Sequence, residues 1–560
     1  MTPAASAPVP SPVGEARWRG LGEPLASRAL VLALLAFATA WNLTKAYHID
    51  DTAYIEIAQW IAGHPLHPMR GRVFWGDEGF TTIDSVNQPH LYLYAMAAWG
   101  RLFGWSEVSM HGLLALFALA AIAMMHRLSR IVLPGRPALA TTLVVASPAF
   151  VVGQNTMVDV PALALWLWFF TLLLGEAGGE RATRRYVAAG AVCGAAILVK
   201  YTGLVLIPAL VLDGLLRRRR AAWYGVAVAM GIVLLWCGFN YWDYGGVHML
   251  TRMDARGFRN VLDPLKWLLC LGAAAPFAFA LAGAWLERQS RPLARGAGVA
   301  LVVLVAAMLP AVAASLGGMI DTAASDVVFA TFFLLSGALA IAVALGALPR
   351  FRDPLQPTVV ARWMLAYWAA AAAAFIVLLA PFVAMRHVLV ALPPLVLLAL
   401  AAVPGGAAAG WRAAAVVTVF AVTCVVASAD RWYAGIYREQ AARLRASLPA
   451  SARVWTAGHW GWQWYAAENG MVQIVPGESR VAVGDFIVYP EHVHRQPLPE
   501  DITTEILREV PIRPTNWVRA FAAPYAGFYA TSAFSQLPWA VHLGPIETFR
   551  VLRVVAVRNP

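Results

Sequence analysis

Long apolar runs dominate the amino-acid sequence. They recur from about residue 27 to residue 428, and short polar segments separate most of them. A helix of about 20 apolar residues crosses the hydrocarbon core of a bilayer. The pattern therefore predicts a polytopic α-helical membrane protein with about thirteen spans, near residues 27–46, 108–126, 137–153, 157–175, 184–200, 202–216, 221–241, 264–285, 296–316, 325–348, 360–383, 387–403 and 410–428.

One further apolar stretch, Leu91–Phe103, is too short for a span. It has 13 residues and contains Gly100 and Arg101, which suits an interfacial or re-entrant helix. When it is left out of the count, every basic cluster in a short loop falls on the cytoplasmic side, as the positive-inside rule requires. These clusters are Arg127, Arg130 and Arg136; Arg181, Arg184 and Arg185; Arg217–Arg220; Arg288, Arg291 and Arg295; Arg350 and Arg352; and Arg412.

The same count assigns a side of the membrane to each polar region. Residues 1–26 are expected in the cytoplasm, while the first loop, residues 47–107, is expected outside it. The tail, residues 430–560, follows the membrane domain of residues 27–429 and is also expected outside. Its short β-rich stretches, broken by Gly and Pro, predict a small soluble mixed α/β domain.

The first apolar run has a feature of secretory signals. Ala38-Thr39-Ala40 is similar to a signal-peptidase site, but the run continues toward Tyr47 at spanning length. We therefore expect an uncleaved signal anchor with its N-terminus in the cytoplasm.

Composition excludes a soluble fold and gives little support to nucleic-acid binding. The chain is 60% hydrophobic and only 13% charged, with a mean hydropathy of +0.62. The net charge of +12 comes largely from the loop clusters, which hold their loops in the cytoplasm. Four cysteines lie inside apolar runs without paired spacing, which indicates small core residues and neither a disulfide nor a zinc site: Cys193, Cys237, Cys270 and Cys424.

Three carboxylates at the outer ends of spans are candidates for chemistry, because ionisable groups near lipid are costly. Asp50 and Asp51 directly follow the first span, and one of them could act as a general base on an acceptor. Alternatively, Asp51 caps the helix that begins at Thr52 and Asp50 is merely solvated. Asp159 lies between the third and fourth spans, where it could also cap a helix ahead of Pro161.

Two cations depart from the positive-inside pattern. Lys200, followed by Tyr201, and Arg386, followed by His387, lie at outer ends of spans. A phosphate group would explain both, since Arg and Lys pair with phosphate oxygens and stabilise a phosphate leaving group. The alternative is that both side chains extend toward lipid headgroups.

The first loop is also rich in side chains that bind metals. Their spacing matches no defined metal motif, and His residues flanked by Pro commonly lie on loop surfaces, so no metal ligand is assigned. A divalent ion in this loop remains an alternative; its candidate ligands are His48, His64, His67, Asp77, Glu78, Asp84 and His90.

Several motifs together resemble glycosyltransferase family 39 of the GT-C membrane glycosyltransferases, which includes protein O-mannosyltransferases and the aminoarabinose transferase of lipid A. The chain is most similar to bacterial members with a short C-terminal domain. The motifs follow one another along nearly the whole chain: Asp50-Asp51-Thr52-Ala53-Tyr54, Gln88-Pro89-His90, Met157-Val158-Asp159-Val160-Pro161, Leu198-Val199-Lys200-Tyr201-Thr202-Gly203, Arg386-His387-Val388-Leu389, Gly458-His459-Trp460-Gly461 and Ala526-Gly527-Phe528-Tyr529.

The resemblance implies transfer of a sugar, with inversion, from a polyprenyl-phosphate donor to a glycan, lipid or protein acceptor outside the cytoplasm. It implies Asp50 as base, assisted by Asp51 and Asp159, and Lys200 and Arg386 as ligands of the donor phosphate. Neighbouring side chains are expected to contact substrate: Tyr54, Tyr201 and His387. Many relatives carry Tyr at the position of His387, and a basic residue or His at that of Gln88, so contacts to the donor headgroup are open.

We therefore expect an enzyme of the bacterial cytoplasmic membrane that acts on the cell envelope, with membrane lipids as its surroundings. A transporter or flippase of a lipid-linked or anionic solute is the alternative, since ionisable residues in membranes also mark substrate paths. Against it, we find no inverted repeat, and the acids and bases gather at one face. A catalytically inactive scaffold is a third interpretation.

Overall fold

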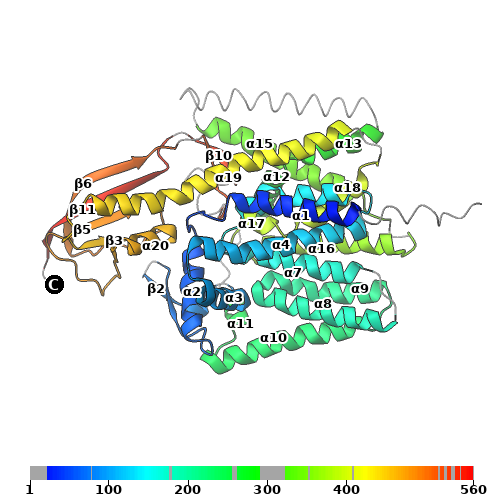
Figure 1. Cartoon of the computed structure of the whole chain (residues 1–560), viewed down its shortest axis with the longest axis horizontal. Helices are drawn as coiled ribbons and strands as arrows, with labels where there is room; N and C mark the ends of the chain where they lie inside the picture. Colours follow the sequence, from blue (N-terminus) through cyan, green and yellow to red (C-terminus); the bar gives the residue numbers. More distant parts are fainter. Residues whose placement is uncertain are drawn as a thin grey trace, which may run out of the picture.

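Helices lie side by side along most of the molecule, and a β-sheet lies at one end of them (Figure 1). The computed structural model describes residues 22–76, 79–86, 88–175, 179–254, 261–289, 322–350, 353–405, 409–514, 517–522, 526–530, 537–542 and 544–558. Within these ranges six helices are long and apolar enough to cross a membrane: α4 (Glu107–Val132), α8 (Gly179–Val199), α10 (Ala222–Tyr244), α15 (Thr322–Leu345), α16 (Pro357–Leu379) and α19 (Ala409–Ala446). The chain is a multi-pass membrane protein, as its hydropathy predicts.

Three of the predicted spans are not continuous helices. The run 137–153 divides into α5 (Pro137–Val145) and α6 (Pro148–Val152), and 387–403 divides into α17 (Met385–Val388) and α18 (Leu392–Ala402). The run 264–285 divides into α12 (Asp263–Ala274) and α13 (Ala278–Gln289), with a bend of 82° between them. A proline lies at or just after each break, where it removes a backbone donor and collides with the preceding turn: Pro148, Pro276 and Pro393.

Four shorter apolar elements occupy other predicted spans. They are α1 (Gly22–Ala40), α7 (Asp159–Leu174), and the 3-10 helix η2 (Tyr201–Val205), which continues into α9 (Leu206–Leu216). The predicted span 296–316 lies outside the described residues. The count of thirteen spans is therefore not reproduced by the described residues, although most of the predicted apolar runs are helical.

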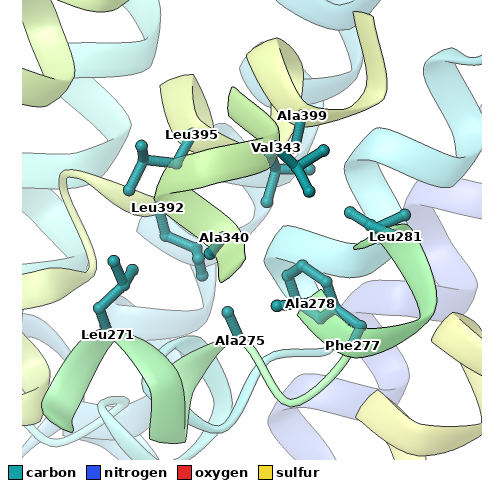
Figure 2. A pocket seen from close by; sticks show the side chains of 11 residues that line it. Leu271, Ala275, Phe277, Ala278, Leu281, Ala340, Val343, Leu392, Leu395 and Ala399 are labelled. Atoms are coloured by element: carbon teal, nitrogen blue, oxygen red, sulfur yellow. The ribbon is translucent and has the colours of Figure 1, made fainter. Parts of the chain in front are cut away.

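The break between α12 and α13 borders a small apolar pocket. Figure 2 shows its lining side chains, which come from α12, α13, α15 and α18 and carry only carbon atoms, among them Leu271, Phe277, Val343 and Leu392. Its free volume is about 10 Å³, close to that of one water molecule. An apolar gap of this size is a packing defect and offers no polar group to a substrate.

The first loop folds into short elements at the sheet end of the bundle (Figure 1). Helix α2 (Asp51–Gly63) packs against α3 (Leu91–Phe103), which has the bounds predicted for the short apolar stretch. Between them lie the antiparallel strands β1 (Arg72–Phe74) and β2 (Phe80–Thr82) and the turn η1 (Ile83–Ser85). Helix α11 (His248–Asp254) lies near them.

The C-terminal part begins inside a helix. Helix α19 runs without a break past Asp430, so no helix ends at the boundary expected there. A five-stranded mixed sheet follows, and helix α20 (Trp460–Glu468) joins its first two strands. The strand order is β4 (Val472–Gln473), β3 (Val454–Thr456), β5 (Phe486–Pro490), β11 (Glu547–Val557) and β6 (Ile502–Ile512).

Strand β11 lies between β5 and β6 and is antiparallel to both, whereas β3 is parallel to β4 and β5. The sheet packs onto α19 through Phe549, whose ring lies 6.2 Å from that of Tyr437 and 5.2 Å from that of Trp462. Two short antiparallel pairs complete the C-terminal part: β7 (Val518–Arg519) with β10 (Ala540–Val541), and β8 (Phe521–Ala522) with β9 (Ala526–Gly527).

Candidate active site

Asp50 and Asp51 follow a strained turn between α1 and α2. Ile49 has a φ of +53°, a conformation that a β-branched residue rarely adopts and that costs roughly 1–3 kcal/mol. The turn is held from both sides. Tyr465 of α20 accepts a hydrogen bond from the backbone N–H of Tyr47 at 2.7 Å, and Asp51 accepts one from that of His48 at 3.0 Å. These contacts hold the backbone of the turn and so fix the direction in which the side chain of Asp50 points.

Asp51 is completely buried and serves as an anchor of this turn. Besides the contact to His48, it accepts hydrogen bonds from the backbone N–H of Thr156 at 2.7 Å and from its hydroxyl at 2.8 Å. Burial raises the pKa of Asp51, while Lys45 and His48 act against that shift. Helix α2 begins at Asp51 itself, and the carboxylate of Asp51 accepts hydrogen bonds from His48 and Thr156 and none from the first turn of the helix. The capping interpretation of Asp51 is therefore wrong.

Four charged side chains from distant segments form an ion-pair cluster beside this turn. A guanidinium nitrogen of Arg386 in α17 lies 3.1 Å from a carboxylate oxygen of Asp50 and 3.8 Å from one of Asp159. The ammonium of Lys200, at the end of α8, lies 2.7 Å from the other oxygen of Asp159. The structure thus brings together two predicted acids and both predicted phosphate ligands.

The alternatives for Asp159, Lys200 and Arg386 are wrong. Asp159 is the first residue of α7 and makes no capping bond; its carboxylate is directed to the two cations. Lys200 and Arg386 are about nine-tenths buried and paired with carboxylates, so they do not extend toward lipid headgroups.

The members of the cluster differ in access to solvent. The side chain of Asp50 is 24% exposed, whereas that of Asp159 is 4% exposed. Among the described residues, the second oxygen of Asp50 makes no hydrogen bond, and the buried Nε of Arg386 has no partner. Burial opposes the charge of Arg386, but Asp50 and Asp159 outweigh it and raise the pKa of the guanidinium. The cluster therefore offers an accessible carboxylate beside a permanent cation with a free donor.

The three predicted substrate-contacting residues differ in position. Tyr54 is buried one turn along α2, and burial together with the charge of Asp50 raises its pKa. His387 is buried beside the cluster, close to the charges of Lys200 and Arg386. Tyr201 points elsewhere: its hydroxyl lies 2.7 Å from a ring nitrogen of His248 and accepts a bond from Trp236 at 3.2 Å.

A second buried cluster was not predicted from the sequence. Asp430 of α19 lies 3.0 Å from the ammonium of Lys45 and 3.2 Å from Nε2 of His48, and it accepts the hydroxyl of Tyr529 at 2.9 Å. Lys45 also donates to Asn155, the residue before Thr156. The sequence offered one signal for this pairing: Lys45 is an ionisable residue at the end of the first apolar run, and Asp430 is one at the end of the last.

The C-terminal part also contacts the segment that carries Arg386. The backbone N–H of Met385 donates to the carbonyl of Phe528 at 3.0 Å, next to Tyr529. Arg386 and Asp430 are therefore both positioned by one short segment of the tail.

The metal alternative finds no support in the described part of the chain, where no three acidic, His or Cys side chains form a ligand group. His48 pairs with Asp430, His67 lies 2.9 Å from Asp243, and His64 stacks on Trp60. Asp77 and Glu78 lie outside the described residues.

Comparison with protein families finds a match over part of the chain. Residues 87–242, which include Asp159 and Lys200, match the family model described as dolichyl-phosphate-mannose-protein mannosyltransferase. The match confirms the predicted resemblance to the GT-C glycosyltransferases. The matched residues make up less than a third of the chain. No curated protein sequence matches the chain.

Particular solved structures are similar at low sequence identity. ArnT from Cupriavidus metallidurans bound to undecaprenyl phosphate is 15% identical, with 85% of this chain and 97% of that chain covered and a TM-score of 0.40. Oligosaccharyltransferase AglB from Archaeoglobus fulgidus in complex with an inhibitory peptide and a dolichol-phosphate is 14% identical, with 83% and 69% covered and a TM-score of 0.45. The arabinofuranosyltransferase AftD from Mycobacteria is 13% identical, with 96% and 40% covered and a TM-score of 0.39.

Proposed function

We propose that this protein transfers a sugar from a polyprenyl-phosphate donor to an acceptor at the extracytoplasmic face, with inversion at the anomeric carbon. The observation that carries the proposal is the pairing of a partly exposed carboxylate, Asp50, with a buried arginine, Arg386, at 3.1 Å. Such a pair joins the two requirements of the reaction: a base for the acceptor and a cation for the leaving phosphate.

Arg386 supplies the cation for the donor phosphate. Its unpaired Nε and its permanent charge favour contact with phosphate oxygens, which arginine binds with two parallel hydrogen bonds. Lys200 adds positive charge at the edge of the cluster but is engaged by Asp159 at 2.7 Å. In this role Asp159 holds the two cations side by side, which would otherwise repel each other.

Asp50 supplies the base. Its free carboxylate oxygen accepts the proton of an acceptor hydroxyl or amine, and the acceptor atom then forms a bond to the anomeric carbon. The bond from that carbon to the phosphate oxygen breaks on the opposite side, and its electron pair leaves with the phosphate. Donor phosphate that binds Arg386 competes with Asp50 for the guanidinium and so frees the carboxylate for proton transfer.

Asp51 has a different role in this scheme. Its carboxylate accepts three hydrogen bonds from His48 and Thr156 and is inaccessible to solvent. We assign it as a positioning residue that holds the turn of Ile49 and Asp50.

The test of the proposal is turnover of the natural lipid carrier. Purified protein in nanodiscs is mixed with undecaprenyl phosphate carrying radiolabelled mannose, aminoarabinose, glucose or galactose, and with envelopes from cells that lack the gene. We expect label from one donor to leave the lipid-extractable fraction. Asp50→Asn should slow this transfer by roughly 10²–10⁴-fold, the usual contribution of a general base.

Asp84→Asn is the matched control, because Asp84 lies in the same loop and undergoes the same change outside the cluster. It should transfer at the rate of the unaltered protein. Transfer by Asp50→Asn at that same rate would remove Asp50 from the chemistry. In sealed proteoliposomes, label that crosses the membrane still attached to its lipid would favour a flippase.

A further inference from the structure

A basic cavity lies at the opposite end of the bundle from the ion-pair cluster. It has a volume of about 470 Å³ and is bordered by the end of α7, the start of α8, the turn from α9 to α10 and the start of α16. Helix α8 joins the two regions: it begins beside this cavity and ends next to Lys200. Its 21 residues correspond to about 30 Å, the thickness of a hydrocarbon core.

Four arginines line the cavity: Arg185, Arg217, Arg218 and Arg219. Two of them have partners within the protein. Arg185 donates to the last carbonyls of α7, those of Leu172 and Leu173, at 2.8 and 3.2 Å. Arg217 lies 2.8 Å from the buried Asp213, which also accepts the hydroxyl of Tyr186 at 2.6 Å.

The side chains of Arg218 and Arg219 have no hydrogen-bond or ion-pair partner among the described residues, and no described residue that lines the cavity carries a carboxylate. Asp213 lies behind the lining and is neutralised by Arg217. Among the described residues, the positive charge of the cavity is therefore compensated by no carboxylate other than Asp213. Charges of one sign in a concave site attract a ligand of the opposite sign.

The backbone gives a second, independent observation. Helix α9 ends in a Schellman turn, in which the N–H of Arg218 donates to the carbonyl of Leu215 at 3.2 Å and that of Arg219 donates to Gly214 at 2.8 Å. The turn requires a left-handed residue at the position of Arg218, whose φ is +53°. Glycine is the usual residue there, because other side chains are strained in this conformation. Here the position carries an arginine that lines the cavity.

We propose that this cavity is a binding site for a phosphate-bearing anion. Arginine pairs with phosphate through parallel hydrogen bonds, and the two arginines without internal partners are placed to make them. The anion has two sources with the same chemistry: the headgroup of an anionic phospholipid of the adjacent leaflet, or a soluble phosphate compound. The site is distinct from the ion-pair cluster and does not depend on the proposed glycosyl transfer.

The test measures binding to the full-length protein in detergent by native mass spectrometry. One probe is dioctanoyl-phosphatidylglycerol, and the other is glycerol 1-phosphate, which carries the same headgroup without acyl chains. We expect Arg219→Ala to weaken binding at least fivefold. Arg220→Ala is the matched control: it removes the same charge from the same turn, but Arg220 does not line the cavity, so its binding should stay within twofold of that of the unaltered protein.

Arg218→Gly separates binding from folding. Glycine adopts the left-handed conformation without strain, so this variant should melt at the same temperature as the unaltered protein or higher, and yet bind at least fivefold more weakly. If glycerol 1-phosphate does not displace the bound lipid, the site binds a lipid headgroup. If glycerol 1-phosphate displaces the lipid, the site binds a soluble phosphate compound. The proposal is overturned if neither probe binds, or if Arg220→Ala loses as much binding as Arg219→Ala.

Discussion

Neighbouring carboxylates have opposite environments in this protein. Asp50 is partly exposed and touches one cation, whereas Asp51 is buried and accepts three hydrogen bonds from the chain around it. The left-handed Ile49 before them turns Asp50 toward Arg386 and Asp51 toward Thr156. The two adjacent aspartates therefore have different roles in our proposal: Asp50 is the base and Asp51 is a positioning residue.

Replacement of Asp51 tests this division. In Asp51→Asn an amide –NH₂ replaces one of the two accepting oxygens and faces a donor N–H. A buried donor without a partner costs about 1–3 kcal/mol. We expect a lower melting temperature and reduced transfer, whereas Asp50→Asn should lose transfer without a lower melting temperature. Thermal unfolding of both purified variants in one detergent measures the difference, and equal melting temperatures would show that Asp51 does not anchor the turn.

At this scale the sequence predicts the acids and cations but not their pairs. Asp50, Asp159, Lys200 and Arg386 could be predicted because each is an ionisable residue at the outer end of an apolar run. Lys45 and Asp430 also lie at the ends of apolar runs, but their pairing could not be predicted, since they are 385 residues apart and no local pattern links them.

Short elements, rather than the long helices, position the candidate site. Helix α17 carries Arg386, and the loop before α7 contacts the buried Lys45–Asp430 cluster through Asn155 and the anchor residue Asp51 through Thr156. Helix α20 lies against the strained turn, and a Cβ on Gly461 would come within 2.2 Å of the carbonyl oxygen of Tyr47. Close packing of α20 therefore requires glycine at this position.

Gly461→Ala tests the contribution of this contact. The added methyl group has to displace backbone, and overpacking of this kind costs about 1–3 kcal/mol. We expect slower transfer together with a lower melting temperature. Gly63→Ala is the control, because nothing lies within 4 Å of a Cβ built at that last residue of α2. Unchanged transfer in Gly461→Ala would mean that α20 does not support the turn of Asp50.

Periodicity predicts the helices but not their interruptions. The bounds of α3, a short and half-buried helix, agree with those of the apolar stretch Leu91–Phe103. The breaks at Pro148, Pro276 and Pro393 were not predicted, because proline inside an apolar run is compatible with a kinked span as well as with two helices.

The two ends of the whole molecule carry different chemistry. Helices α2, α3 and α17, the last of which carries Arg386, lie toward the sheet end of the molecule (Figure 1), and the arginine-rich turn of residues 217–220 lies at the other end. Arginine-rich turns are retained in the cytoplasm. On this basis we propose that the sheet and the ion-pair cluster face the extracytoplasmic side.

Cysteine labelling tests this orientation. Glu478→Cys lies on an exposed turn of the C-terminal part, and Arg220→Cys lies on the exposed turn after α9. In intact spheroplasts a membrane-impermeant maleimide should label Glu478→Cys and should label Arg220→Cys only after lysis. The unaltered protein gives the background from its four free cysteines. The reverse labelling pattern would contradict the orientation.

The central claim is that Asp50 acts as the general base and Arg386 as the ligand of the donor phosphate. Binding of undecaprenyl phosphate to the purified full-length protein, measured beside transfer in the same preparations, tests it most directly. We predict that Arg386→Ala binds at least tenfold more weakly, about 1.4 kcal/mol. Asp50→Asn should bind as tightly as the unaltered protein or more tightly, and transfer sugar roughly 10²–10⁴-fold more slowly. Undiminished binding by Arg386→Ala, or weaker binding by Asp50→Asn, would contradict the claim.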